Sequence, residues 1–470
     1  MKAQVLFALI LMLFSGMPWA EQGEHFAAQG PITALKNLES ASSLDVLPHS
    51  RPFAVQHWKT ENGLSVWFVP TSQLPMLDVR LVFNAGAARD QDQSGLAMLT
   101  SNLVFEGTDT QNATTIARKF ESLGAEYGTE CARDMSMIEL RTLTDAQYLN
   151  PVLNELVEVL AHANFPVDAF NRIRNQQLTG LKEELQSPSA IASRMFWTRL
   201  YENQPYGAMP QGTTETLLKI KPEDVRAFYA RYFTPANAVL ALVGNLSRQQ
   251  ADDFARQVAH ALHAGKAAPP LPQPVSINKP VVFDKEFSSE QTHILMGGLA
   301  ISKSDPRFYA LMIGNEILGG SGFSSMLTRA VRVEHGYSYS VGSSFVPMQQ
   351  NGPFVISMQT RNDQAQQARD LAEKVVNDFI QKGPTQVQID DAKAQLLGSY
   401  PLGLASNSAI LGNLAVMGFY HLPEDYLINY PKNINKVTLD EVRTVDRQLM
   451  DPMHWLTIMV GHHEPSKKEP

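Results

Sequence analysis

Gly95-Leu96-Ala97-Met98-Leu99-Thr100-Ser101-Asn102-Leu103-Val104-Phe105-Glu106-Gly107-Thr108 is the stretch that decides how this chain folds. Positions i, i+3 and i+4 of a helix share one face, and Met98, Ser101 and Asn102 stand at that spacing. Zinc is bound by imidazole nitrogen, thiolate or carboxylate, so a thioether, a hydroxyl and a carboxamide are a poor ligand set. Ser101 also cannot replace a carboxylate as general base at neutral pH. The stretch predicts a helix with the spacing of a metal-binding motif and without its chemistry.

The frame around these three positions resembles the H-x-x-E-H motif of the inverzincins, the pitrilysin/insulinase family of zinc peptidases. Members of that family typically read G-L-A-H-F-L-E-H-M-x-F-x-G-T. The frame residues shared by this chain are Gly95, Leu96, Ala97, Phe105, Gly107 and Thr108. The three working positions carry Met98, Ser101 and Asn102 in place of His, Glu and His. The resemblance implies a helix that kept its fold and lost its zinc ligands.

The rest of the family's zinc site is replaced as well. The family's third ligand is a Glu on a later helix that commonly begins F-P-x-x-x-F-x-R-x-R, which residues 165–174 resemble. Aligned on this start, the ligand position falls on Gly180 and a second acidic position falls on Ile173. Glu183 and Glu184 lie close by, and we expect them to form the solvated end of this helix. We therefore predict that this chain binds neither zinc nor another cofactor.

A second constellation resembles a different part of the same family. Residues 319–327, Gly-Gly-Ser-Gly-Phe-Ser-Ser-Met-Leu, resemble the family's L-G-G-G-x-x-S-R-L, and residues 331–341 resemble its V-R-E-x-x-G-L-A-Y-S-V. The resemblance implies that the catalytic Arg and Tyr of this motif are Arg332 and Tyr339. A guanidinium offers a rigid fork of donors to a carbonyl or carboxylate. A phenol can donate a hydrogen bond to the oxyanion of a tetrahedral intermediate.

The Gly-rich turn before this pair would let the backbone pass close to an extended substrate. The candidate substrate-binding residues are Gly319, Gly320, Ser321, Gly322 and Phe323. By spacing alone, Arg332 is a solvated helix residue and Tyr339 a strand residue of the core. The surrounding motif favours the functional interpretation, and Tyr337, one strand step away on the same face, is the alternative phenol.

The chain repeats itself at an offset of 217 residues. The identities in register are Lys219/Lys436, Val225/Val442, Arg226/Arg443, Pro235/Pro452, Val243/Val460 and Gly244/Gly461. Each copy predicts an acid-started helix, a Pro-marked turn and an apolar strand, with chance similarity of two common units as the alternative. Further helices are predicted over 168–184 and 388–399. Residues 64–69 and 77–83 predict a hairpin of strands, and 292–297 and 354–358 predict strands of the second copy.

We therefore predict an α+β fold with two homologous domains, each a mostly antiparallel or mixed sheet with helices packed on one face. The predicted domains are residues 48–262 and 282–466, joined by a Pro-rich linker over 263–281. The family resemblance covers about residues 48–465 and implies a clamshell arrangement of the two halves.

Composition limits the functional classes. The 470 residues are 44% apolar and 18% charged, which is typical of a globular protein, and the net charge of −8 argues against a nucleic-acid partner. Residues 1–20 predict a secretory signal, followed by a leader over 21–47. The apolar run of that signal is short for a membrane span, and Cys131 is the only cysteine. We expect an exported, soluble protein of a bacterial periplasm, without membrane attachment after signal removal.

The resemblance implies a function in partnership. In the short-chain branch of the family, two polypeptides of about this length can pair, one with the H-x-x-E-H site and the other with the Arg/Tyr pair. We predict that this chain is the second kind, a non-catalytic subunit whose homologous partner binds zinc and whose substrate is a peptide. One alternative is a peptidase-like peptide-binding or scaffold protein without a proteolytic role. Another is an active hydrolase with unrecognised ligands.

Overall fold

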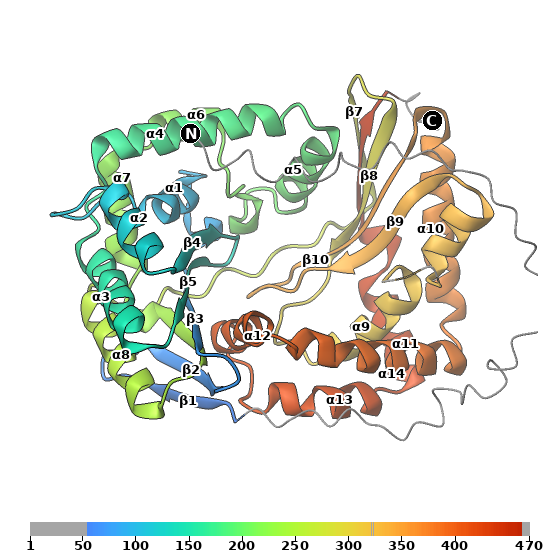
Figure 1. The fold of residues 1–470 in the computed structure, drawn as a ribbon. Helices are drawn as coiled ribbons and strands as arrows, with labels where there is room; N and C mark the ends of the chain where they lie inside the picture. Colours follow the sequence, from blue (N-terminus) through green and yellow to red (C-terminus); the bar gives the residue numbers. More distant parts are fainter. Residues whose placement is uncertain (1–53, 321, 323, 463–470) are drawn as a thin grey trace, which may run out of the picture. The chain divides into compact units, whose positions relative to one another are not determined.

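Two β-sheets organise the part of the chain that the computed structural model describes, which is residues 54–320, 322 and 324–462 (Figure 1). The predicted signal and leader lie outside the described residues, as do Ser321 and Phe323. Contacts group Ser50–Pro470 into one unit, so the domain boundaries at 48–262, 263–281 and 282–466 stay predictions.

The first sheet has the strand order β1-β2-β6-β3-β5-β4. Its strands are β1 (Gln56–Lys59), β2 (Ser65–Pro70), β3 (Met76–Phe83), β4 (Glu126–Cys131), β5 (Ser136–Leu143) and β6 (Ala238–Gly244). β6 runs parallel to β2 and antiparallel to β3, and the other pairs are antiparallel. Every residue of β6 is buried, as its wholly apolar sequence requires.

The predicted hairpin of residues 64–69 and 77–83 is wrong. Both strands form, as β2 and β3, but β6 lies between them and pairs with each. Because β6 carries no polar side chain and is buried along its length, a strand on each side satisfies all its backbone groups. The alternation of apolar and polar residues along a strand identifies its two faces, but it does not specify which strand pairs with it.

The first half also contains eight α-helices and three 3-10 turns among the described residues. They are α1 (Leu96–Leu103), α2 (Ala113–Ser122), α3 (Ala146–His162), α4 (Val167–Glu184), α5 (Pro188–Leu200), α6 (Thr214–Lys219), α7 (Pro222–Tyr232) and α8 (Arg248–Ala261), with 3-10 turns η3 (Ala87–Arg89), η4 (Pro205–Gly207) and η5 (Pro235–Asn237). Polar side chains start several of them: Asn112, Ser187 and Ser247 each accept a hydrogen bond from the backbone three residues on.

The second sheet has the strand order β7-β11-β8-β10-β9. Its strands are β7 (Val281–Glu286), β8 (Gln291–Leu299), β9 (Ser338–Phe345), β10 (Pro353–Arg361) and β11 (Leu456–Gly461). The accompanying helices are α9 (Phe308–Leu318), the π-helix η6 (Thr328–Glu334), η7 (Asn362–Gln364), α10 (Ala365–Lys382), α11 (Gln386–Ser399), η8 (Tyr400–Leu404), α12 (Asn407–Phe419), α13 (Tyr426–Lys436), α14 (Leu439–Leu449) and η9 (Pro452–His454).

The sequence repeat is a repeat of structure. α7 and α14 begin 217 residues apart, at Pro222 and Leu439, and β6 and β11 end 217 residues apart, at Gly244 and Gly461. β11 also holds the place of β6, because it runs parallel to β7 on one side and antiparallel to β8 on the other. The predicted α+β fold with two mostly antiparallel sheets is confirmed.

The two halves exchange one helix each. α5, from the first half, packs on β11 and β8 of the second sheet, and α12, from the second half, packs on β6, β3 and β2 of the first (Figure 1). One apolar cluster joins Phe196 of α5 to Ile458 of β11, and another joins Leu414 of α12 to Val239 of β6. Each sheet therefore has helices of its own half on one face and a helix of the other half on the opposite face.

No single helix of the described ranges is both long enough and apolar enough to cross a membrane. The bent pair Gln386–Leu404 and Asn407–Phe419 reaches the required length and composition together, with an angle of 106° between its parts. The apolar side chains of α12 are accounted for by their contact with the first sheet.

Candidate functional site

The degenerate zinc helix α1 begins in a strained backbone that its sequence is built to support. Gly95 has φ 100°, and a Cβ there would lie 2.8 Å from Leu217 Cδ2 and 3.0 Å from Gly212 Cα. The Asp90 carboxylate accepts hydrogen bonds from Gly95 N at 2.7 Å and Ala97 N at 2.8 Å. Burial raises the pKa of Asp90 to about 8, and these backbone donors oppose that rise. The start of the helix is therefore fixed by a glycine and a buried acid.

Three of the four degenerate zinc positions line one cavity of about 540 Å³. Met98 and Asn102 reach it from α1, and Gly180 reaches it from α4, together with Ile173. The other lining residues are Thr129, Gln176, Gln177, Leu181, Glu184 and Gln211. Ser101 is absent from this wall: its side chain is fully buried, and its hydroxyl has no hydrogen-bond partner among the described residues.

The side chains around this cavity do not fit zinc. Met98 offers a thioether, Asn102 a carboxamide, and Gly180 no side chain. The one carboxylate on the wall, Glu184, forms an ion pair with Arg194 at 3.2 Å. Within residues 54–320, 322 and 324–462, no three His, Cys, Asp or Glu side chains are grouped to hold a metal ion.

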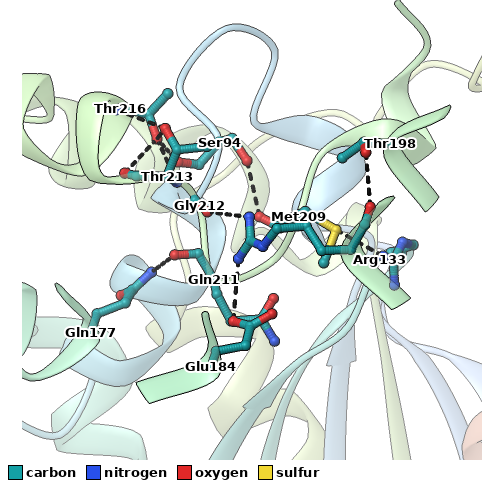
Figure 2. A network of polar contacts seen from close by, with 11 residues as sticks. Ser94, Arg133, Gln177, Glu184, Thr198, Met209, Gln211, Gly212, Thr213 and Thr216 are labelled. Atoms are coloured by element: carbon teal, nitrogen blue, oxygen red, sulfur yellow. Dashed lines mark hydrogen bonds and ion pairs between the residues drawn. The ribbon is translucent and has the colours of Figure 1, made fainter. Parts of the chain in front are cut away.

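Glu184 also corrects the sequence prediction. Glu183 is exposed as expected, but the Glu184 side chain is only 19% exposed, because Arg194 of α5 lies against it. The same guanidinium donates to Gly212 O at 3.0 Å, and Gln177 Nε2 donates to Gln211 O at 3.2 Å (Figure 2). These contacts tie α4, α5 and the loop before α6 into one wall of the cavity.

Arg332 and Tyr339 lie together on the second half. The Arg332 guanidinium carbon stands 4.3 Å from the centroid of the Tyr339 ring, within cation–π range. Arg332 comes from η6 and Tyr339 from β9, the edge strand of the second sheet. The Tyr339 side chain is 79% exposed, so its interpretation as a core residue is wrong.

A β-bulge explains this exposure. Gln359 pairs with Ser340 and Thr360 pairs with Ser338, which leaves Tyr339 as the extra residue on β9. The Ser338 hydroxyl lies 2.7 Å from Ser340 O and 2.7 Å from Gln359 O, across the bulge. Tyr337 is half-buried against the core, so the expectation that it shares the face of Tyr339 is also wrong.

The Gly-rich turn packs on the same edge strand. Gly319 O accepts a hydrogen bond from Ser343 N at 2.7 Å, and a Cβ on Gly319 would lie 2.5 Å from Ser343 Oγ. Gly320 packs as closely on Glu316 of α9, and Gly322 has φ 94°. The turn therefore contacts β9 at Ser343, four residues along the strand from Tyr339. Four residues correspond to about 13 Å along a strand.

Family models match both halves of the chain. Residues 70–213 match the model described as Insulinase (Peptidase family M16), and residues 219–396 match the model described as Peptidase M16 inactive domain. The crystal structure of a peptidase M16 inactive domain from Pseudomonas fluorescens is 36% identical, with a TM-score of 0.84, and the match covers 88% of this chain and 99% of that one. The chain belongs to the M16 peptidase family.

Other M16-like proteins are more distant. The uncharacterized zinc protease YmxG of Bacillus subtilis is 24% identical over 410 residues, covering 86% of this chain and 98% of that protein. The non-peptidase homolog YmxG of Helicobacter pylori is 28% identical over 376 residues, covering 78% and 85%. The crystal structure of a protease from Helicobacter pylori, at 17% identity and a TM-score of 0.80, covers 87% and 99% and shares the fold.

One buried polar cluster of this M16 chain was missed by the sequence prediction. The Asp134 carboxylate accepts hydrogen bonds from Tyr206 Oη at 2.6 Å, Tyr420 Oη at 3.0 Å and Gln349 N at 2.8 Å. Burial raises the pKa of Asp134, and these donors oppose the rise. Because the partners are up to 286 residues apart in the chain, no local pattern could have predicted the contact.

Proposed function

We propose that this M16 chain is the zinc-free subunit of a two-chain zinc peptidase. It contributes Arg332, Tyr339 and part of the peptide-binding surface, and a homologous partner carries the H-x-x-E-H site. One combination of observations carries the proposal: the zinc-ligand positions are replaced, while Arg332 still contacts the ring of Tyr339, which is exposed to solvent.

The pair has the chemistry of a transition-state donor. The Tyr339 hydroxyl forms no hydrogen bond within the described residues, and the ring is held by the adjacent guanidinium. A phenol in this position can donate to the oxygen that becomes negatively charged during peptide hydrolysis. Such a donor contributes about 2.7–4 kcal/mol to the transition state when it is preorganised. The metal-bound water chemistry belongs to the partner.

The edge strand β9 is suited to an extended peptide. β9 pairs with β10 on one side, and none of the described strands pairs with its other side. An extended peptide can add to such an edge through main-chain hydrogen bonds. The Gly-rich turn packs against the same strand, so Gly319, Gly320 and Gly322 are placed to limit how the peptide passes. The roles of Ser321 and Phe323 rest on the motif alone.

The similar proteins support the absence of intrinsic peptidase activity. The match to the M16 inactive domain and the name of the Helicobacter pylori non-peptidase homolog both point this way. The signal predicted over residues 1–20 would place the chain in the periplasm, so its partner and its peptides would be periplasmic as well.

Reconstitution with an H-x-x-E-H homologue tests the proposal. We expect the mixture to cleave peptides efficiently, and we expect neither chain to do so alone. Tyr339→Phe should lower kcat/KM of the mixture by about 100-fold, as for loss of a preorganised oxyanion donor. Arg332→Ala should also lower kcat/KM, because it removes the guanidinium beside the Tyr339 ring, and neither change should separate the chains. Arg329→Ala is the matched control, since Arg329 lies on the same π-helix and pairs with Glu334 at 2.9 Å. Chelator-sensitive cleavage by the purified chain alone would overturn the proposal.

A peptide-binding role without proteolysis is the second candidate. It is favoured by the cavity beside α1, where Asn102, Gln176, Gln177 and Gln211 stand around the former zinc position. Carboxamides can both donate and accept hydrogen bonds, as a peptide backbone requires. Unchanged function of an Arg332→Ala, Tyr339→Phe double variant, with peptide binding in the absence of any partner, would favour this candidate.

A further inference from the structure

A second cavity, of about 430 Å³, lies away from Arg332 and Tyr339 and from the degenerate zinc site. Its floor is one face of the β1–β2 pair. In this pair Lys59 stands opposite Ser65, and His57 stands opposite Trp67. Residues two apart on a strand share a face and opposed residues have neighbouring Cβ atoms. The four side chains therefore form one patch, and all four line the cavity.

Three of the lining side chains form a continuous hydrogen-bonded row. His57 Nε2 lies 3.1 Å from Ser65 Oγ, and His57 Nδ1 lies 3.1 Å from Glu424 Oε1. Glu424 belongs to the segment between α12 and α13, so this row joins the two halves of the chain. Both distances are within the range for a nucleophile, its base and the group that orients the base.

One assignment of protons satisfies the row with a neutral imidazole. The ionised Glu424 carboxylate only accepts hydrogen bonds, so His57 Nδ1 carries the proton and Nε2 is the acceptor. Ser65 then donates its hydroxyl proton to Nε2. The Trp67 indole N–H donates to Ser65 Oγ at 3.2 Å, and its ring stacks on His57 with centroids 4.4 Å apart. The stack and the two hydrogen bonds fix the imidazole toward Ser65.

We propose that Ser65, His57 and Glu424 form an acyl-transfer site that hydrolyses small carboxylic esters. Ser65 is the nucleophile and His57 the general base, while Glu424 is a positioning residue that acts through His57. This activity is independent of the peptidase partnership proposed above. The arrangement follows the logic of the serine hydrolase triad, in which geometry and roles identify the site whatever the order of the residues in the chain.

The cavity supplies the other requirements of this chemistry. The Lys59 ammonium forms no ion pair within the described residues and stands directly opposite Ser65, where it can stabilise the negative oxygen of a tetrahedral intermediate. Phe419 and Leu422 provide an apolar wall for an acyl chain. His421, on the same wall, has φ 54°, because it closes α12, where Leu422 N donates to Met417 O at 2.8 Å.

The reaction balances with water as co-reactant. Ser65 Oγ bonds to the ester carbonyl carbon as its proton passes to His57 Nε2. The carbon–oxygen bond to the alcohol then breaks, and the alcohol leaves with that proton. The oxygen of a water molecule then bonds to the carbonyl carbon of the acyl group on Ser65, and the water gives one proton to Nε2. Collapse of the second intermediate releases the carboxylic acid and returns the proton to Ser65 Oγ.

The first test uses the unaltered full chain. A fluorophosphonate probe should label Ser65, as located by peptide mass spectrometry, and the chain should hydrolyse p-nitrophenyl butyrate in the presence of a chelator. Absence of both reactions, or labelling confined to other residues, would overturn the proposal. Because this test needs no substitution, a folding defect cannot obscure it.

Variants then assign the roles. Ser65→Ala and His57→Gln should each lower ester hydrolysis by about 100-fold or more, with Ser122→Ala, at an exposed serine that ends α2, as the unchanged control. Glu424→Gln should lower kcat about tenfold at constant KM, and Glu424→Asp should restore part of the loss. If Ser65, His57 and Glu424 had only a structural role, every variant whose thermal unfolding midpoint is unchanged would also have an unchanged kcat. That result would refute the assignment.

Discussion

Asp446 is a buried acid that lowers the stability of this fold when it is ionised. Its side chain is 1% exposed in α14, and neither carboxylate oxygen has a hydrogen-bond partner among the described residues. It packs against Gly314 of α9, where a Cβ would lie 2.1 Å from Asp446 Oδ1. Burial raises the pKa of this carboxyl well above its ordinary value. The protonated acid is therefore the form that the folded chain prefers.

We expect Asp446→Asn to stabilise the chain increasingly as pH rises. The folded pKa of Asp446 lies above the unfolded pKa, so wild-type stability is highest below the unfolded value and falls as pH rises through the folded one. Asparagine keeps the shape and cannot ionise. Denaturant unfolding should show a gain of about 1–3 kcal/mol at about pH 8 and a smaller gain at about pH 5.

Asp440→Asn, at an exposed position of the same helix, is the control for this change. We expect it to alter the free energy of unfolding by no more than about 0.5 kcal/mol at either pH. A gain for Asp446→Asn that is equal at both pH values would show that ionisation of the buried carboxyl is not the cause.

At the scale of elements, α1 and α4 keep the framework of a metal site whose ligands are gone. Met98, Asn102 and Gly180 still line one cavity, and a Cβ on Gly180 would meet nothing within 4 Å. The triple variant Met98→His, Asn102→His, Gly180→Glu should therefore bind one zinc ion, because two imidazoles and a carboxylate are an accepted ligand set. Metal analysis after dialysis, and a thermal shift on adding zinc, would measure it.

The control is the double variant that keeps Gly180, which should hold zinc far more weakly. If the triple variant keeps its fold but binds no zinc, then α1 and α4 do not face each other at ligand distance. Ser101 stays unaltered in this experiment, because its buried side chain does not reach the cavity and a Glu there would place a charge in the core.

The elements also show where prediction from sequence succeeds and where it stops. Motifs with local spacing predicted α1, α4 and the repeated helix–turn–strand that ends at Gly244 and Gly461. The sequence did not predict β6 between β2 and β3, or the bulge that turns Tyr339 to solvent. Both depend on which strands pair and in which register. The alternation of apolar and polar residues along one strand specifies neither the partner nor the register.

At the scale of the whole molecule, the exchange of α5 and α12 makes each sheet depend on the other half of the chain. Neither helix was predicted to cross, because an apolar helix face does not specify the sheet that covers it. The Asp134 cluster adds buried hydrogen bonds to residues of both halves, from Tyr206 to Tyr420. Together these contacts predict that the described halves unfold in one cooperative transition.

Leu414→Ala tests this cooperativity. Leu414 of α12 is fully buried against the first sheet, so the substitution should lower the free energy of unfolding by about 2–5 kcal/mol. Amide hydrogen exchange should then accelerate equally in β6 and in β8, although Leu414 packs with the first sheet alone. Leu218→Ala, at a leucine that is 60% exposed, should leave both rates unchanged. Faster exchange in β6 with β8 unaffected would mean that the halves unfold separately, despite the helices that they exchange.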